Sequence, residues 1–180
     1  MNLKDAKYSK YALVQEMMDT VGVVKKFDAD QTKKTAKEIK KAGKLLLTGE
    51  GSSRIFPAKN AIRKALTMGM DLSIVTDGSR QSAQYNLKKF AVFCASNSGR
   101  TKEVVLLAKM LGDIGNDKRY ALTANKDTLL EKECKKTFVL TCGWEQAVAA
   151  TKSVIEQALF YESILWHIEG MKGSKIIKNL

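Results

Sequence analysis

Cysteine, histidine and proline are scarce in this chain, and their scarcity excludes several classes of protein. There are three cysteines, one histidine and one proline among 180 residues. The cysteines, Cys94, Cys134 and Cys142, are odd in number and lack the paired spacing of zinc ligands. They indicate reduced thiols in a cytoplasm, with neither a disulfide framework nor a metal site, and we expect no cofactor.

Long hydrophobic runs are also missing. No uncharged apolar stretch approaches the roughly 20 residues that a membrane-spanning helix needs. The lysine-containing N-terminus lacks the apolar core of a signal peptide. We therefore expect a cytoplasmic protein with no membrane partner. The length and the apolar fraction of 44% fit one domain with a sizeable core.

Acidic residues are few relative to basic ones. The chain has 31 lysines and arginines against 19 acidic residues, for a formal charge of +12. In the densest basic block, Lys33 to Lys44, lysines alternate with apolar residues, and no aromatic platform or helix-turn-helix signature accompanies them. A solvated helix face explains this block better than a nucleic-acid interface. We expect no specific nucleic-acid partner, although the positive field should attract phosphorylated ligands.

The stretch Phe90–Val105, FAVFCASNSGRTKEVV, carries the strongest functional signal. It opens with an apolar run that predicts a buried strand and ends in a helical pattern. Between them, the small polar turn 96–101 lets an anion approach the free N–H groups and positive dipole of a helix start. Hydroxyls of Ser96, Ser98 and Thr101 add donors. The turn predicts a phosphate site, although an ordinary strand-to-helix turn can have the same composition.

Strand and helix patterns alternate along the chain. Strands are expected at 44–48, 71–76, 90–95, 119–124 and 136–141. Helices are expected at 8–26, 31–42, 53–68, 101–114, 128–133 and 144–168, with a short helix or loop at 78–85 and a loosely held tail at 172–180. Right-handed crossovers then give an α/β fold, a doubly wound five-stranded parallel sheet in a three-layer α-β-α sandwich.

The predicted sheet order is 2-1-3-4-5, in which the first and third strands are neighbours. Their following turns, at 49–53 and 96–101, would then face one crevice at the carboxyl ends of the strands. In the 53–68 helix the single proline, Pro57, fits the first turn. The apolar side of that helix is expected to carry Phe56, Ala61, Ile62, Ala65 and Leu66.

Three motifs occur in order along the chain: GEGSS at 49–53, SNSGRTKE at 96–103 and WEQAVAATKS at 144–153. Together they resemble the SIS (sugar isomerase) family of phosphosugar isomerases and phosphosugar-binding regulators. The resemblance covers about residues 44–165 and is greatest to the first SIS repeat in the isomerase portion of glucosamine-6-phosphate synthase. It implies a flavodoxin-like SIS fold and a single SIS domain over 1–180. The expected parts are N-terminal helices at 1–43, an α/β core at 44–170 and a basic tail at 171–180.

The resemblance also implies a site in which small polar residues surround a sugar phosphate. The second motif would hold the phosphate, and the first would contact the phosphate or sugar hydroxyls, unless its serines only cap the following helix. Lys152 would meet the ligand or pair with Glu156. Ala150 stands where the family often has serine, which leaves the sugar preference open. The implied binding residues are Gly51, Ser52, Ser53, Ser96, Asn97, Ser98, Gly99, Thr101, Val148 and Lys152.

Aldose–ketose isomerisation needs a base that moves a proton between adjacent carbons. The candidate base is Glu145, expected in the first turn of the final helix, where Trp144 would raise its pKa by desolvation. His167, the single histidine, is favoured for a helix-face or interface role. In the catalytic second repeat of the synthase the helix after the first motif carries the base. The matching stretch here, 61–66, has no carboxylate, which weakens the enzyme hypothesis.

The sequence therefore favours a phosphosugar-binding protein that isomerises its ligand between aldose and ketose forms without a metal. The alternative is a phosphosugar sensor or regulatory module without catalysis. Either protein is expected to form a homodimer or homotetramer, because family members pair to complete each other's sites. Large apolar groups on more than one face of the final helix support pairing: Phe160, Tyr161, Ile164 and Trp166.

Overall fold

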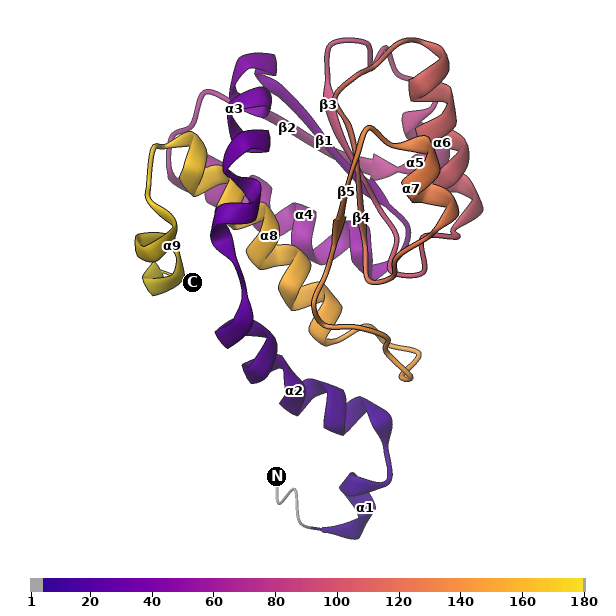
Figure 1. Ribbon diagram of the computed structural model, residues 1–180, viewed down its shortest axis with the longest axis vertical. Coiled ribbons are helices and arrows are strands. Elements are labelled where there is room, and N and C mark those ends of the chain that lie inside the picture. The colour runs from indigo at the N-terminus through magenta and orange to yellow at the C-terminus, as the bar shows by residue number, and fades with distance from the viewer. Residues whose placement is uncertain (1–4, 180) are drawn as a thin grey trace.

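The computed structural model describes residues 5–179, which fold around a parallel sheet (Figure 1). The five strands of this part of the chain are β1 (Lys44–Gly49), β2 (Ser73–Gly78), β3 (Ala91–Ala95), β4 (Arg119–Thr123) and β5 (Lys136–Val139). They all pair in parallel, in the order β2-β1-β3-β4-β5. The doubly wound, flavodoxin-like fold predicted from the alternation of patterns is confirmed, including its strand order.

Helices cover both faces of the sheet (Figure 1). One layer contains α3 (Lys33–Ala42), α4 (Ser52–Thr67) and α8 (Lys152–Ile168), and the other contains α5 (Ser79–Ser82), α6 (Lys102–Asp113) and α7 (Leu129–Glu133). The remaining helical segments among residues 5–179 are α1 (Ala6–Ser9), α2 (Ala12–Lys26), η1 (Ala29–Thr32) and α9 (Gly173–Asn179).

Successive side chains of the central strands enter two different cores. Leu47 and Phe93 pack in the core beneath α4 and α8, whereas Leu46 and Cys94 pack in the core beneath α6. Strand side chains alternate between the faces of a sheet, so a strand covered on both faces must be apolar throughout. This requirement explains why β1 and β3 appear in the sequence as continuous apolar runs. Because β1 and β3 run parallel, the turns that follow them lie at the same edge of the sheet.

The final helix begins at Lys152 and not at Trp144, which corrects the predicted helix 144–168. The preceding residues form a loop because a side chain takes the N–H groups at the helix start. The Glu145 carboxylate accepts hydrogen bonds from the backbone N–H groups of Thr151 (2.8 Å) and Ser153 (3.2 Å). A carboxylate from outside the helix thus performs the capping role and keeps residues 144–151 out of the helix.

Pro57 lies in the interior of α4 and not in its first turn, contrary to the prediction. Proline has no N–H, so the carbonyl of Ser53, four residues earlier, loses its helical donor. Gln157 of α8 replaces that donor, because its side-chain amide donates to the Ser53 carbonyl at 2.6 Å. The helix tolerates proline here since a neighbouring helix supplies the missing hydrogen bond.

The buried stripe of α4 consists of alanines and not of its larger apolar side chains. Ala58, Ala61 and Ala65 are buried, whereas Phe56 and Leu66 are 63% and 77% exposed. Small residues allow α4 to lie close against α8, and they leave no room for larger groups on that face. The predicted apolar side is therefore wrong for Phe56 and Leu66.

Both ends of the described chain differ from the prediction. The expected helix 8–26 is broken near Tyr11 into α1 and α2. The expected loose tail is helix α9, whose Ile176 is fully buried; Leu180 lies outside the described residues. His167 joins these ends, because its ring nitrogens lie 3.1 Å from the Met171 carbonyl and 2.9 Å from the Ala29 carbonyl. His167 therefore contacts residues of its own chain on both sides.

Candidate functional site

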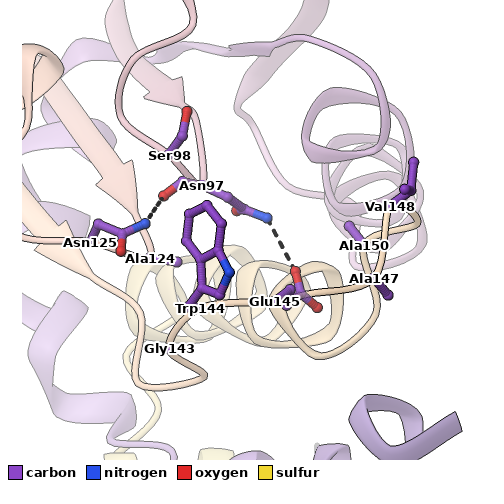
Figure 2. A pocket seen from close by; sticks show the side chains of 10 residues that line it. All are labelled: Asn97, Ser98, Ala124, Asn125, Gly143, Trp144, Glu145, Ala147, Val148 and Ala150. Carbon is purple, nitrogen blue, oxygen red and sulfur yellow. Dashed lines mark hydrogen bonds between the residues drawn. The ribbon is translucent and has the colours of Figure 1, made fainter. Parts of the chain in front are cut away.

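A cavity of about 150 Å³ opens where β3 and β4 end (Figure 2). Its walls come from three segments: the turn after β3, the loop after β4 and the loop before α8. The lining residues are Asn97, Ser98, Ala124, Asn125, Gly143, Trp144, Glu145, Ala147, Val148 and Ala150. Ligands of doubly wound sheets bind at the carboxyl ends of the strands, so this cavity is the candidate site.

The turn after β3 holds its hydroxyl groups together. The Ser96 hydroxyl lies 2.8 Å from that of Thr101 and 3.5 Å from that of Ser98. The Gly99 N–H donates to the Ser96 carbonyl at 3.0 Å, which closes the turn. Ser96 is buried while Ser98 faces the cavity. The turn therefore presents a compact group of donors directly before α6.

Gly99 is required at the centre of this turn. Its φ of +62° lies in the left-handed region, and a Cβ at this position would collide with the side chain of Thr128. The loop before α7 packs against the turn at this point, since the Leu130 N–H donates to the Gly99 carbonyl at 3.1 Å. The Asn125 side chain also donates, to the Asn97 carbonyl, at 2.8 Å. The segment after β4 thus fixes the shape of the turn after β3.

The first motif, GEGSS, follows the neighbouring strand. Gly49 pairs with Ala95 in the sheet, so the turns after β1 and β3 start side by side. A Cβ on Gly49 would lie 2.7 Å from the Ala95 carbonyl oxygen, which only glycine avoids. Neither Ser52 nor Ser53 uses its side chain to cap α4. Helix capping, the alternative to ligand binding, is therefore not the role of these serines in this structure.

Glu145 forms hydrogen bonds within the loop before α8, to the start of α8 and to the turn after β3. Its carboxylate accepts from the Thr151 N–H and hydroxyl at 2.8 and 2.9 Å and from the N–H and hydroxyl of Ser153. The Asn97 amide donates to Glu145 at 3.4 Å and to the Ser153 hydroxyl at 2.7 Å. One carboxylate thereby connects two walls of the cavity (Figure 2).

The hydrogen bonds of Glu145 determine its pKa. Burial by itself would raise that pKa, but the donors of Ser153 and Thr151 stabilise the ionised form more, so the pKa is lowered. The expected rise caused by Trp144 is wrong, as is the expected position in the first helical turn. A carboxylate with a lowered pKa is a weaker proton acceptor at neutral pH than the sequence suggested.

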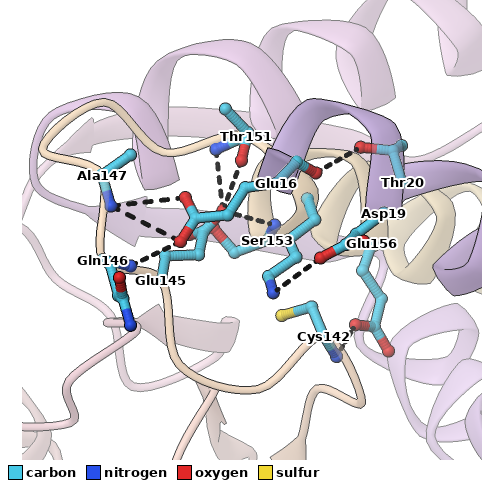
Figure 3. A network of polar contacts seen from close by, with 11 residues as sticks. Glu16, Asp19, Thr20, Cys142, Glu145, Gln146, Ala147, Thr151, Ser153 and Glu156 are labelled. Carbon is cyan, nitrogen blue, oxygen red and sulfur yellow. Dashed lines mark hydrogen bonds and ion pairs between the residues drawn. The ribbon is translucent and has the colours of Figure 1, made fainter. Parts of the chain in front are cut away.

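The N-terminal helix α2 holds the same loop from the opposite side (Figure 3). The Glu16 carboxylate, only 6% exposed, accepts from the backbone N–H groups of Gln146 at 2.5 Å and Ala147 at 3.3 Å. Lys152 lies 3.8 Å from Asp19 of α2 and does not line the cavity. Contacts between residues 130 positions apart therefore set the loop conformation.

Glu156, the other expected partner of Lys152, has a separate role. Its carboxylate accepts from the Thr141 N–H and hydroxyl at 2.7 and 2.8 Å and from the Cys142 N–H at 2.7 Å. It ties the chain after β5 to α8, just before the cavity loop starts. The expected pairing of Lys152 with Glu156 does not form.

The structure brings only some of the residues proposed from the sequence to the cavity wall. Asn97, Ser98, Glu145 and Val148 line it. The other residues named in the sequence analysis are not among its lining residues: Gly51, Ser52, Ser53, Ser96, Gly99, Thr101 and Lys152. Asn125 and Trp144 also line the cavity, although the sequence motifs imply no ligand role for either residue. Asn125 could have been found, because it directly follows a strand of the sheet. No sequence signal showed that Trp144 would face the cavity.

The described residues were also searched for metal-binding groups and for membrane-spanning helices. Residues 5–179 contain no group of three histidine, cysteine or acidic side chains that could hold a metal ion. Within the same range, none of the helices has the length and apolarity required to cross a bilayer.

No protein-family model matches the chain, and no curated protein sequence matches it. Solved structures do match. The C-terminal domain of glucosamine-fructose-6-phosphate aminotransferase from Francisella tularensis aligns at TM-score 0.71 and 17% identity, over 94% of this chain and 52% of that chain. Escherichia coli CFT073 protein c3406 aligns at TM-score 0.72 and 19% identity, over 98% of this chain and 97% of that chain. Vibrio vulnificus NanR, solved with ManNAc-6P, aligns at TM-score 0.64 and 17% identity, over 93% and 64%.

The chain spans about half the length of the Francisella tularensis domain, 52%, and of a further matching structure from Silicibacter pomeroyi, 53%. At such identities the likeness shows the fold alone. That fold is the one shared by SIS-domain phosphosugar isomerases, and the resemblance seen in the three motifs is confirmed at this level.

Proposed function

We propose that the chain binds a sugar phosphate in the cavity formed by the turn after β3, the loop after β4 and the loop before α8. The observation that carries this proposal is the linked hydroxyl group of Ser96, Ser98 and Thr101 at the start of α6, beside a cavity lined by side-chain amides. Two of the similar structures hold sugar-phosphate ligands, which supports the same ligand class here.

The phosphate and the sugar of the ligand contact different groups of the protein. The phosphate lies at the turn after β3, where hydroxyls, backbone N–H groups and the helix dipole favour an anion. The neighbouring turn, Gly51 to Ser53, adds contacts to the phosphate or to sugar hydroxyls. The sugar extends toward Asn125 and the loop before α8. The net charge of +12 raises the local concentration of phosphorylated ligands.

Binding without chemistry is the role that the geometry of this chain favours. Glu145 is the only carboxylate among the described residues that line the cavity. Its oxygens accept several hydrogen bonds and its pKa is lowered, which is unsuited to a general base. We therefore rank the phosphosugar sensor or regulatory module above the isomerase for the isolated chain.

Isomerisation is the second candidate, with a base contributed by another copy of the chain. The cavity is small compared with typical ligand pockets of about 300–1,000 Å³ and is open at fully exposed Val148. Exposed apolar side chains on α2, on Tyr11 just before it and on α4 offer surface for pairing. On the two helices they are Leu13, Met17, Met18, Val21, Val24, Phe56 and Leu66. We propose a homodimer or homotetramer, and a single 20.0 kDa species in light scattering at micromolar concentration would refute it.

We propose that the protein works in the cytoplasm. Cys94, Cys134 and Cys142 are free thiols, which suits a reducing compartment. The proposal includes no metal, no cofactor and no sequence-specific nucleic acid. Binding to duplex DNA should accordingly be weak and should fall steeply with added salt.

The decisive experiment is calorimetry with a panel of hexose and pentose phosphates, combined with an assay of ketose formation on the same samples. We expect binding of at least one sugar phosphate and much weaker binding of the unphosphorylated sugar. Absence of binding to every sugar phosphate would overturn the proposal. Binding with turnover would select the isomerase, and binding without turnover would select the sensor.

A further inference from the structure

The loop before α8 holds an exposed tryptophan in the candidate site. Trp144 is 67% exposed and lines the cavity. Figure 2 shows its indole ring in the middle of the lining residues. Among residues 5–179 no other ring or cation stacks on it. Burial of an aromatic side chain is strongly favourable, so a ring left open in a cavity is available for a ligand.

The other tryptophan shows what an engaged indole looks like in this protein. Trp166 packs against the core beneath α8, and the Lys64 ammonium lies 5.2 Å from its ring centroid. The chain has two tryptophans, and only Trp144 faces the site. The two rings therefore give separate spectroscopic signals, one from the cavity and one from the core.

Trp144 is exposed although hydrogen bonds hold the backbone next to it. The next residue, Glu145, is hydrogen-bonded to Thr151 and Ser153, and the two residues after it donate their N–H groups to Glu16. Both sets of bonds fix the segment that carries the indole. The ring is thus pre-positioned, and a ligand does not have to order the loop in order to use it.

The groups around the ring define the occupant. Asn97 and Asn125 provide amides, Ser98 provides a hydroxyl, and the indole provides a flat apolar face. A cyclic sugar has matching parts, because its ring carbons present C–H groups on a face while its hydroxyls lie around the edge. We propose that Trp144 is a stacking platform for the sugar ring and makes the site select cyclic sugar phosphates over small phosphates. This inference rests on the proposed function.

The test uses the intact chain and three tryptophan variants, Trp166→Phe, Trp144→Phe and Trp144→Ala. Hexose phosphates should change the tryptophan emission of the wild type and of Trp166→Phe, whereas inorganic phosphate should not. The change should be absent in Trp144→Phe. Calorimetry should show that Trp144→Ala weakens hexose-phosphate binding roughly tenfold, that Trp144→Phe restores most of it, and that affinity for inorganic phosphate changes less than about twofold.

Several results would overturn the inference. One is an equal loss of affinity for hexose phosphate and inorganic phosphate in Trp144→Ala, and another is no loss for either. Tighter binding of a nucleoside monophosphate than of any hexose phosphate would assign the ring to a base. Emission of Trp144 that changes with protein concentration before ligand is added would assign it to an interface between copies. If the wild type binds no sugar phosphate in calorimetry, the proposed function fails first and this inference fails with it.

Discussion

The turn after β3 and the loop before α8 are two walls of one cavity, yet they are held in different ways. In the turn, the central contacts join residues close in sequence, such as the 2.8 Å contact between the hydroxyls of Ser96 and Thr101. In the loop, a decisive contact comes from Glu16, which is 130 positions away from Gln146. One wall is shaped mainly by its own sequence and the other by a distant helix.

The difference assigns separate tasks to the two walls. A turn closed by its own hydroxyls and a glycine at positive φ, and braced by the segment after β4, is suited to a constant group such as phosphate. The loop before α8 is held by carboxylates from α2 and from its own sequence, so its conformation depends on how α2 packs. Such a loop suits the part of the ligand that varies, and it couples the site to the packing of α2.

The largest effect should follow removal of the hydroxyls of the turn. Ser98→Ala combined with Thr101→Ala deletes two donors, and each hydrogen bond to a charged group contributes about 1.5–3 kcal/mol. Sugar-phosphate affinity should fall more than about a hundredfold in calorimetry. Thr67→Ala, which removes an exposed hydroxyl from the far end of α4, is the matched control and should bind normally. Normal affinity in a folded double variant would exclude this turn as the phosphate site.

Glu145→Gln should have the next largest effect. It distinguishes a structural role of Glu145, which holds the loop before α8, from a catalytic role. The amide keeps the shape but places a donor against the donors of Thr151, Ser153 or Asn97. We expect roughly tenfold weaker binding and a stability loss of about 1–2 kcal/mol in chemical denaturation. A general base would behave differently, with binding spared and turnover lowered by about 10²–10⁴-fold. The second outcome would restore Glu145 as the catalytic residue.

Glu16→Ala should weaken binding less, by about three- to tenfold, because it frees one edge of the loop without touching the turn. Hydrogen exchange at the N–H groups of Gln146 and Ala147 should accelerate, and Glu16→Gln should recover part of the protection. Asp19→Ala is the control on the same helix, since its ion pair with Lys152 is mostly exposed on the aspartate side. Equal exchange at Gln146 in wild type and Glu16→Ala would contradict a role for α2 in holding the loop.

The smallest effect is a pH dependence confined to the loop. The pKa of Glu145 is lowered in the folded protein, so its contribution to stability is complete above the ordinary value of 4.5. The contribution is lost as the pH falls through the lower folded value. Thermal unfolding between about pH 7 and pH 3 should therefore show the wild type converging on Glu145→Gln at the acid end. A constant difference across that range would show that ionisation of Glu145 is not what fastens the loop.

Much of the fold follows from the sequence because its causes are local or periodic. Apolar runs at β1 and β3, polar turns after them and the alternation of patterns are sufficient to predict a doubly wound sheet and its order. The hydroxyl turn could be found because a strand, a glycine-containing turn and a helix lie consecutively along the chain. Asn125 could have been added by the same reasoning, since it follows β4 at the same edge.

Local patterns are misleading at positions where distant contacts outweigh local preference. Residues 144–151 have a helical pattern, but Glu145 and Glu16 take N–H groups that a longer helix would use internally. Pro57 sits inside α4 because Gln157, a hundred positions further on, supplies the missing donor. Neither outcome can be deduced from neighbouring residues.

The sequence by itself thus determined the order of the strands and the hydroxyl-bearing turn at the end of β3. Burial on both faces demands apolar strands, and a closed turn needs glycine at positive φ. Only the tertiary structure decided where α8 begins, that the pKa of Glu145 is lowered, and that the indole of Trp144 stands open in the cavity. These features depend on side chains that meet only after the chain has folded, when α2 and α8 bring Glu16, Gln146 and Ser153 to one loop.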